Sequence, residues 1–407
     1  LGLQLEADPG WAELRITGVD PTGPSAGQAG LGLLIAVEGD GERVEVVSSD
    51  LIEEPDVLAT YAEMNAFFAR QSEIHSVINA RKKIVEYYAL DGDTVRYEPG
   101  LRLSRTVWEL PLAFWLQIGV GLAGFWIGAW VWTLRRGDWA ARMLALAGAG
   151  LMISAFPAAV YSTRELAIDG ATFAVLSTIN HAGALIFGVG MIGLFLLYPR
   201  RLAAPRWLLV PAAILMGWYG LDALHLFGIL HLVEGPGLGF HLPVVLAMTA
   251  ILALVGVQYF ATKGDPLARA ALGWLGIAVT VGAGAFVVTV IAPNLLGIGP
   301  LLAQGEAFLF FLLIYVGVAL GVARYRLFQL DEWAFRILFY VVGVVVLLVL
   351  DAVLIFTIVE ERAPAFALSL LLVAILYLPL RDFLARWILG RREPRREALF
   401  RRVMDVA

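Results

Sequence analysis

The sequence contains no cysteine, which excludes disulfide bonds and thiolate metal sites. Lysine is almost as scarce, since Lys82, Lys83 and Lys263 are the only examples. The sequence also has no His-Glu-x-x-His of a metalloprotease and no Walker phosphate-binding loop. These absences leave no catalytic residue to assign in this chain and no cofactor that it is expected to bind.

Apolar residues dominate, at 59% of the chain with a mean hydropathy of +0.77. From Leu110 to Pro379 they form a series of blocks, each close to the ~20 apolar residues that cross a bilayer as a helix. The sequence therefore predicts three regions: a mixed domain at 1–105, a multi-span membrane bundle at 106–380, and an Arg-rich tail at 381–407. The net charge of −5 averages over these different parts.

The expected fold is an α-helical polytopic membrane bundle of about nine spans with an N-terminal α/β domain. The predicted spans are 110–134, 140–163, 172–198, 207–230, 241–262, 268–292, 301–323, 335–359 and 364–380. The connecting segments expected on one side of the membrane carry nineteen Lys and Arg residues, eight of them after Pro379. The segments expected on the other side carry only Arg164 and Arg362. The positive-inside rule then predicts an outside N-terminal domain, a cytoplasmic C-terminus and a location in the bacterial inner membrane.

Local patterns divide the N-terminal domain into strands and one helix. Strand periodicity occurs around Leu14 to Thr17, and further strands are expected at 33–37, 44–47, 84–90 and 94–97. The 3–4 spacing of apolar residues predicts a helix from Pro55 to Phe68. In the bundle, Gly124 and Gly128 form a Gly-x-x-x-Gly pair that we expect to serve internal helix packing.

Ionisable and amide side chains inside membrane spans are costly and are therefore functional candidates. We expect those of this chain to lie in the outer half of the bundle, with Asp222 and His225 one turn apart on one helix face. Either they line a ligand pocket open to the outside, or they pair with neighbours and only set helix register. These ligand-binding candidates are Asn180, His181, Asp222, His225, Glu306 and Asp351. No metal site is assigned, with His231, Glu234 and His241 as weak candidates because imidazole suits metals.

The segment Gly23-Pro-Ser-Ala-Gly-Gln-Ala-Gly-Leu31, followed by Leu33-Leu-Ile-Ala-Val-Glu-Gly39, is similar to the turn and strand of bacterial PDZ domains. This resemblance implies a PDZ-like domain at 1–105. PDZ domains bind the C-termini of peptides by adding a strand to an exposed sheet edge. A PDZ-like fold that only contacts the membrane region is the alternative.

The joint Arg324-Tyr-Arg-Leu-Phe-Gln-Leu-Asp331, followed by Arg336, resembles a joint between late spans of multi-span bacterial sensor histidine kinases. The order of parts also resembles the sensor half of ComP-like kinases, which have an extracytoplasmic PDZ-like domain, a bundle and a basic helix leading to the kinase. The resemblance implies a homodimeric two-component receptor for an extracytoplasmic peptide or small lipophilic ligand. Arg324, Arg326, Asp331 and Arg336 would belong to its cytoplasmic relay.

The kinase itself would lie beyond Ala407, where ATP and Mg²⁺ would bind and a response regulator would dock. The tail at 381–407 is expected to be a basic amphipathic linker helix held by membrane lipids, with no role in nucleic-acid binding. A start at Leu1 without Met leads us to expect a further span or signal segment before it. The alternatives are a secondary transporter coupled through Glu306 and Asp351, and an intramembrane protease using Asp222 and Asp351.

Overall fold

A computed structural model describes residues 1–7, 14–28, 32–88, 92–100, 109–225, 235–296, 301–302 and 304–325, without the side chains at 267, 295, 304 and 320–325. The chain divides into two units, Leu1–Val316 and Gly317–Ala407. The sheet, the candidate site and all contacts reported below lie within the first unit.

The N-terminal region forms a six-stranded antiparallel sheet. Its strands follow the order β1-β2-β3-β5-β6. The remaining strand, β4, pairs with β3 further along β3 than β2 does. The strands are β1 (Leu3–Ala7), β2 (Leu14–Val19), β3 (Leu33–Gly39), β4 (Glu42–Glu45), β5 (Lys83–Tyr88) and β6 (Thr94–Tyr97). The strands expected from the sequence are confirmed to within two residues at each end, whereas the PDZ assignment stays a prediction.

One long helix, α1 (Tyr61–Ile78), packs on this sheet. It begins where the Thr60 hydroxyl accepts a hydrogen bond from the Glu63 N–H, which satisfies one of the free donors of the first turn. The helix predicted to start at Pro55 therefore starts later. The segment before α1 instead contains two single 3₁₀ turns, η1 (Ser48–Leu51) and η2 (Pro55–Val57).

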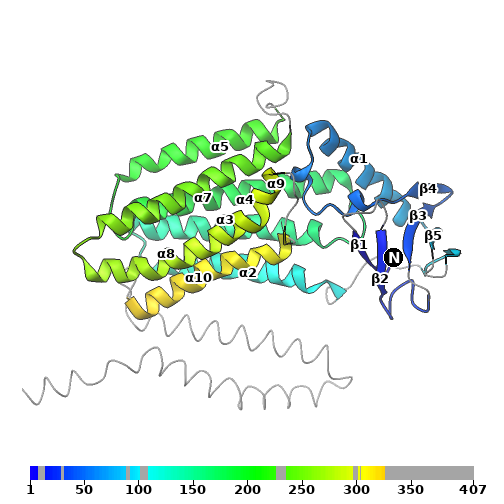
Figure 1. The fold of residues 1–407 in the computed structure, drawn as a ribbon, viewed down its shortest axis with the longest axis horizontal. Coiled ribbons are helices and arrows are strands. Elements are labelled where there is room, and N and C mark those ends of the chain that lie inside the picture. The colour runs from blue at the N-terminus through cyan, green and yellow to red at the C-terminus, as the bar shows by residue number, and fades with distance from the viewer. Residues whose placement is uncertain are drawn as a thin grey trace, which may run out of the picture. The chain divides into compact units, whose positions relative to one another are not determined.

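The bundle helices lie side by side, with the sheet gathered at one end of them (Figure 1). They are α2 (Leu112–Leu134), α3 (Trp139–Ser162), α4 (Gly170–Leu197), α5 (Leu209–Ala223, preceded by η4, Pro205–Leu208), α7 (Pro236–Ala261), α8 (Pro266–Phe286), α9 (Ala292–Leu295) and α10 (Gln304–Tyr325). A π-helical turn, η5 (Val287–Ile291), joins α8 to α9. It precedes Pro293, whose missing N–H interrupts regular α-helical bonding.

Among the residues that the structure describes, five helical segments are long and apolar enough to cross a membrane by length and composition: Leu112–Leu134, Trp139–Ser162, Gly170–Leu197, Pro236–Ala261 and Ala268–Asn294. The fold is therefore a helical bundle whose long apolar helices indicate a membrane protein. Of the other four predicted spans, α5 has only 15 residues and the apolar part of α10 is Gly305–Ala319. The predicted spans 335–359 and 364–380 and the tail 381–407 lie outside the described residues.

Small residues bring the first three membrane helices into backbone contact. A Cβ atom on Gly128 would lie 2.8 Å from the Leu144 carbonyl oxygen, and one on Gly148 would lie 2.3 Å from the Gly124 carbonyl oxygen. These distances are shorter than van der Waals contact, so only glycine permits the approach of α2 to α3. The predicted internal use of the Gly124–Gly128 pair is confirmed.

The N-terminal domain is docked on the bundle through the loop between α3 and α4. Leu166 and Ala167 of this loop are buried in the same hydrophobic cluster as Ile74 of α1 and Val85 of β5. Beside them, the side chain of Glu165 accepts hydrogen bonds from the N–H groups of Leu1 and Leu3, both at 2.9 Å. The domain and the bundle thus share one core.

Arg164 provides the main polar contact of this docking. Its guanidinium group donates to the carbonyl oxygens of Asp50 at 2.9 Å and Ile52 at 2.6 Å, and it lies 4.7 Å from the centre of the Phe173 ring. Burial lowers the pKa of Arg164 to about 10, although the carboxylates of Glu53 and Glu54 oppose this change. The side chain therefore remains a cation at neutral pH.

Candidate functional site

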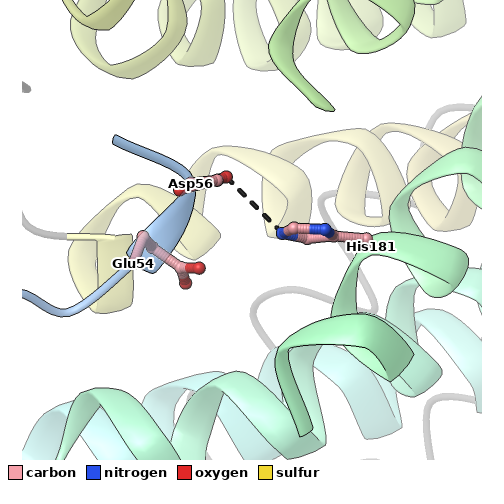
Figure 2. A group of neighbouring side chains, drawn as sticks. All are labelled: Glu54, Asp56 and His181. Carbon is pink, nitrogen blue, oxygen red and sulfur yellow. Dashed lines mark ion pairs between the residues drawn. The ribbon is translucent and has the colours of Figure 1, made fainter. Parts of the chain in front are cut away.

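Next to the 3₁₀ turn η2, carboxylates of the N-terminal domain lie close to histidines of the bundle. The Asp56 carboxylate lies 3.6 Å from Nε2 of His181 on α4 and 3.8 Å from Nε2 of His241 on α7. Figure 2 shows the His181 ring directed at Asp56, with the Glu54 carboxylate turned to the same side. Glu54, Asp56 and His181 each offer one ligand atom, and these atoms lie within 4.8 Å of one another.

Each member of this cluster is fixed by its own element. Pro55 begins η2 and sets the backbone between Glu54 and Asp56, while the Tyr161 hydroxyl of α3 donates to the Glu54 carboxylate at 2.6 Å. The ring of His181 stacks on Phe240 with centroids 3.7 Å apart. Asp56, His181 and Tyr161 are buried and Glu54 and Phe240 are partly buried, so the cluster concentrates charge in a place where water is scarce.

The charge of Asp56 is maintained by its neighbours. Burial alone would raise the pKa of this carboxyl, but the nearby imidazoles of His241 and His181 outweigh burial and lower the pKa below its ordinary value. Asp56 is therefore a carboxylate at neutral pH, although only 2% of its surface is exposed.

A third carboxylate, that of Asp222, lies near the other ring nitrogen of His181. Asp222, near the end of α5, lies 4.0 Å from Nδ1 of His181 and accepts a hydrogen bond of 2.5 Å from the Tyr61 hydroxyl. Burial and this carboxylate raise the pKa of Tyr61, so the phenol keeps its proton and acts as a donor. A Cβ atom on Gly239 would lie 2.2 Å from an Asp222 oxygen, so glycine is required there as well.

A cavity of about 400 Å³ opens beside the cluster, a size that suits a small-molecule ligand. Its polar lining residues are Glu53, Glu54, Asp56, Ser154, Asn180, His241 and Asn294. The rest of the wall is apolar and includes Leu151, Phe187, Val244, Met248, Phe308 and Phe311. The cavity lining is therefore partly polar and largely apolar, and both the N-terminal domain and the bundle contribute to it.

The structure brings together some of the candidates predicted from the sequence. Asn180 lines the cavity and donates to the Ser154 carbonyl oxygen at 2.9 Å and to its hydroxyl at 3.0 Å. His181 and Asp222 lie beside each other, as described above. His241, expected only as a weak metal candidate, faces Asp56 and lines the cavity.

Other candidates lie elsewhere. The predicted shared helix face of Asp222 and His225 is wrong, because α5 ends at Ala223 and His225 adopts a left-handed conformation with φ of 54°. The His225 ring instead stacks on Tyr61 at 4.7 Å. Glu306 is exposed in the first turn of α10 and is not part of the cavity wall.

The remaining candidates cannot be located in the structure. Asp351, His231, Glu234, Arg326, Asp331 and Arg336 lie outside the described residues, and of Arg324 only the helical backbone is described. The roles predicted for these residues therefore stay predictions.

Sequence reasoning missed Glu54, Asp56, Tyr61 and Asn294. The acidic run Glu53-Glu54-Pro-Asp56 was visible in the sequence, but it precedes a helix in a domain treated as separate from the bundle. Only the docking of that domain directs these carboxylates toward the membrane helices.

The sequence also contains Gly23-Pro-Ser-Ala-Gly27, which has the spacing of a serine-hydrolase nucleophile elbow. The elbow requires a turn between a strand and a helix, whereas this segment is a turn between β2 and β3. The Ser25 hydroxyl donates to the Leu1 carbonyl oxygen at 2.6 Å and accepts from the Tyr97 hydroxyl at 2.7 Å. Its hydrogen bonds are thus structural.

Comparisons with models of protein families, with curated proteins and with solved structures found no match. Any functional assignment has to come from the site itself.

Proposed function

We propose that this chain is the sensory and transmembrane region of a two-component sensor histidine kinase, and that an amphiphilic ligand binds in the cavity between the N-terminal domain and the bundle. The observation that carries the ligand site is the shared wall, because residues of the domain line the cavity together with residues of α4 and α7; those of the domain are Ile52, Glu53, Glu54, Asp56 and Val57. A ligand in this space contacts both parts at once and so can favour one docked arrangement over another.

The chemistry of the wall defines the ligand class. The apolar lining residues suit an alkyl or acyl chain, and the polar ones offer carboxylates, amides and imidazole to a head group. This fits the small lipophilic signal expected from the resemblance to ComP-like kinases. In this proposal the N-terminal domain is extracytoplasmic, the chain acts as a homodimer in the bacterial inner membrane, and the kinase and its response regulator lie on the cytoplasmic side.

Spin labels can measure the docking directly, because a chain without cysteine permits labelling at introduced sites alone. We would label Ser76→Cys on α1 and Thr133→Cys on α2, both exposed, and record their distance distribution by electron paramagnetic resonance in lipid nanodiscs. The probes are decylamine, decanol and decanoic acid. At least one is expected to raise the thermal stability of the chain and to shift the distance distribution.

Two phenylalanine substitutions on α4 separate binding in the cavity from effects of the lipid. Ala184→Phe places a ring in the cavity and is expected to abolish both responses. Val175→Phe, at a position 58% exposed on the same helix, is the matched control and should respond as wild type. Binding of a probe without any change in distance would refute the receptor proposal.

A secondary transporter is the second candidate, and the interruption of α8 by the π-helical turn η5 beside the cavity favours it. Val290 and Ile291 of this turn line the cavity, and broken helices at binding sites are typical of transporters. Movement of a probe that binds the chain across proteoliposomes would support this candidate. A receptor is expected to bind the same probe without transporting it.

A further inference from the structure

The cluster beneath η2 has the composition and geometry of a metal site. Asp56 faces two imidazole nitrogens, and the Glu54 carboxylate lies within 4.8 Å of the Asp56 and His181 ligand atoms. Imidazole and carboxylate together are a common ligand set for Zn²⁺ and related divalent ions. Four residues are thus available on three separate elements of the fold.

The spacing between these atoms fits shared coordination better than direct hydrogen bonding. The Asp56 oxygen lies 3.6 Å from His181 Nε2 and 3.8 Å from His241 Nε2, both longer than an N–H···O hydrogen bond. Two ligand atoms that are each about 2.1 Å from a tetrahedral zinc ion lie about 3.4 Å apart. Shifts of a few tenths of an ångström would therefore bring the Asp56 oxygen and each imidazole nitrogen to the spacing of two zinc ligands.

The opposite nitrogens of the two histidines have partners that suit metal ligands. Nδ1 of His241 lies 3.0 Å from the Gly237 carbonyl oxygen, which can only accept, so Nδ1 carries the proton and the neutral ring has its lone pair on Nε2. Nδ1 of His181 lies on the side of Asp222, which the Tyr61 hydroxyl holds in place. Metal-binding histidines characteristically place a carbonyl or carboxylate behind the ring in this way.

Unsatisfied atoms point to the same site independently. Among the described residues, Oδ1 of Asp56 and Nε2 of His181 are buried and have no hydrogen-bond partner. The same holds for Oδ1 of Asn294, whose amide nitrogen lies 3.4 Å from His241 Nε2. A buried carboxylate oxygen without a donor is costly, and a bound cation removes this cost.

We propose that Glu54, Asp56, His181 and His241 bind a divalent transition-metal ion, with Zn²⁺ as the reference ion. The ion joins the N-terminal domain to α4 and α7, because two ligands come from each part. This proposal stands whether or not the chain is a signalling receptor.

Zinc binding by the full chain tests the proposal. The chain is purified in detergent with its affinity tag removed, stripped with a chelator and equilibrated with Zn²⁺, and the metal is then measured by mass spectrometry. We expect one zinc ion per chain and a higher thermal unfolding temperature with zinc than without. Asp56→Asn and His181→Gln should abolish both effects.

Two further variants distinguish coordination from general damage. His75→Gln makes the same chemical change on α1, away from the cluster, and should bind zinc as wild type does. Asp222→Asn, behind His181, should weaken binding by about 10- to 100-fold without abolishing it. A Co²⁺-loaded chain should show the intense visible absorption of tetrahedral coordination, and this absorption should be absent from His241→Gln.

Two results would overturn the proposal. Wild-type chain that takes up no zinc after chelation would mean that Asp56, His181 and His241 do not form a metal site. Zinc uptake that is equal in wild type, Asp56→Asn and His181→Gln would place the ion elsewhere. The first result needs no variant, so the proposal stays testable even if the substituted chains do not fold.

Discussion

Arg164→Ala is expected to loosen the docking of the N-terminal domain. In the wild type its guanidinium group donates to two carbonyl oxygens of the segment that carries the candidate site, those of Asp50 and Ile52. The Ile52 carbonyl receives no other hydrogen bond among the described residues, whereas the Asp50 carbonyl also accepts from Gln71 at 3.0 Å. The two acceptors are therefore affected unequally.

The magnitude follows from these contacts. Leaving the partly buried Ile52 carbonyl without its donor costs about 1–3 kcal/mol, and losing one of two bonds at Asp50 costs about 0.5–1.5 kcal/mol. Removing the cation from the face of Phe173 adds about 0.5–1 kcal/mol. The free energy of unfolding should thus fall by about 2–5 kcal/mol. Arg164→Lys keeps the charge but loses the planar fork, so its effect should be intermediate.

Denaturant titration in detergent, followed by tryptophan fluorescence, measures this change. Arg43→Ala is the matched control, because Arg43 also pairs with carboxylates but on the solvated surface of the sheet. Solvent screens such pairs, so this variant should unfold close to wild type. If Arg164→Ala were as stable as Arg43→Ala, the inference that Arg164 holds the two parts together would be refuted.

Two further predictions concern the same interface. Gly170→Ala should weaken docking, because the added Cβ atom would lie 1.8 Å from the Phe68 carbonyl oxygen. Gly273→Ala is the control, because a Cβ atom there meets open space and the change should be neutral or stabilising. Equal thermal stability of the two variants would contradict this prediction. Because the pKa of Asp56 is held below 3.8, its stabilising charge is present above about pH 4 and lost as the pH falls through the folded-state pKa. The difference in unfolding free energy between wild type and Asp56→Asn should therefore persist at about pH 5, and its disappearance there would indicate a raised pKa instead.

The sequence alone determined the membrane character of the chain and most of its local structure. The length of an apolar run and the alternation of side chains are properties of consecutive residues, so α2, α3, α4 and α7 and the strands of the sheet could be predicted closely. Asn180, His181 and Asp222 could also be singled out, because a polar side chain within an apolar span is costly wherever it lies.

The tertiary structure alone decided what these residues face. Asp56 and His181 are more than a hundred positions apart, and no periodicity relates a 3₁₀ turn in one domain to a helix in another. Their meeting depends on Arg164, Glu165 and Leu166, which dock the domain through a loop whose sequence resembles any other short joint. The end of α5 was likewise decided by its surroundings, since His225 leaves the helix to stack on Tyr61. The site is thus a property of long-range packing, which local patterns do not encode.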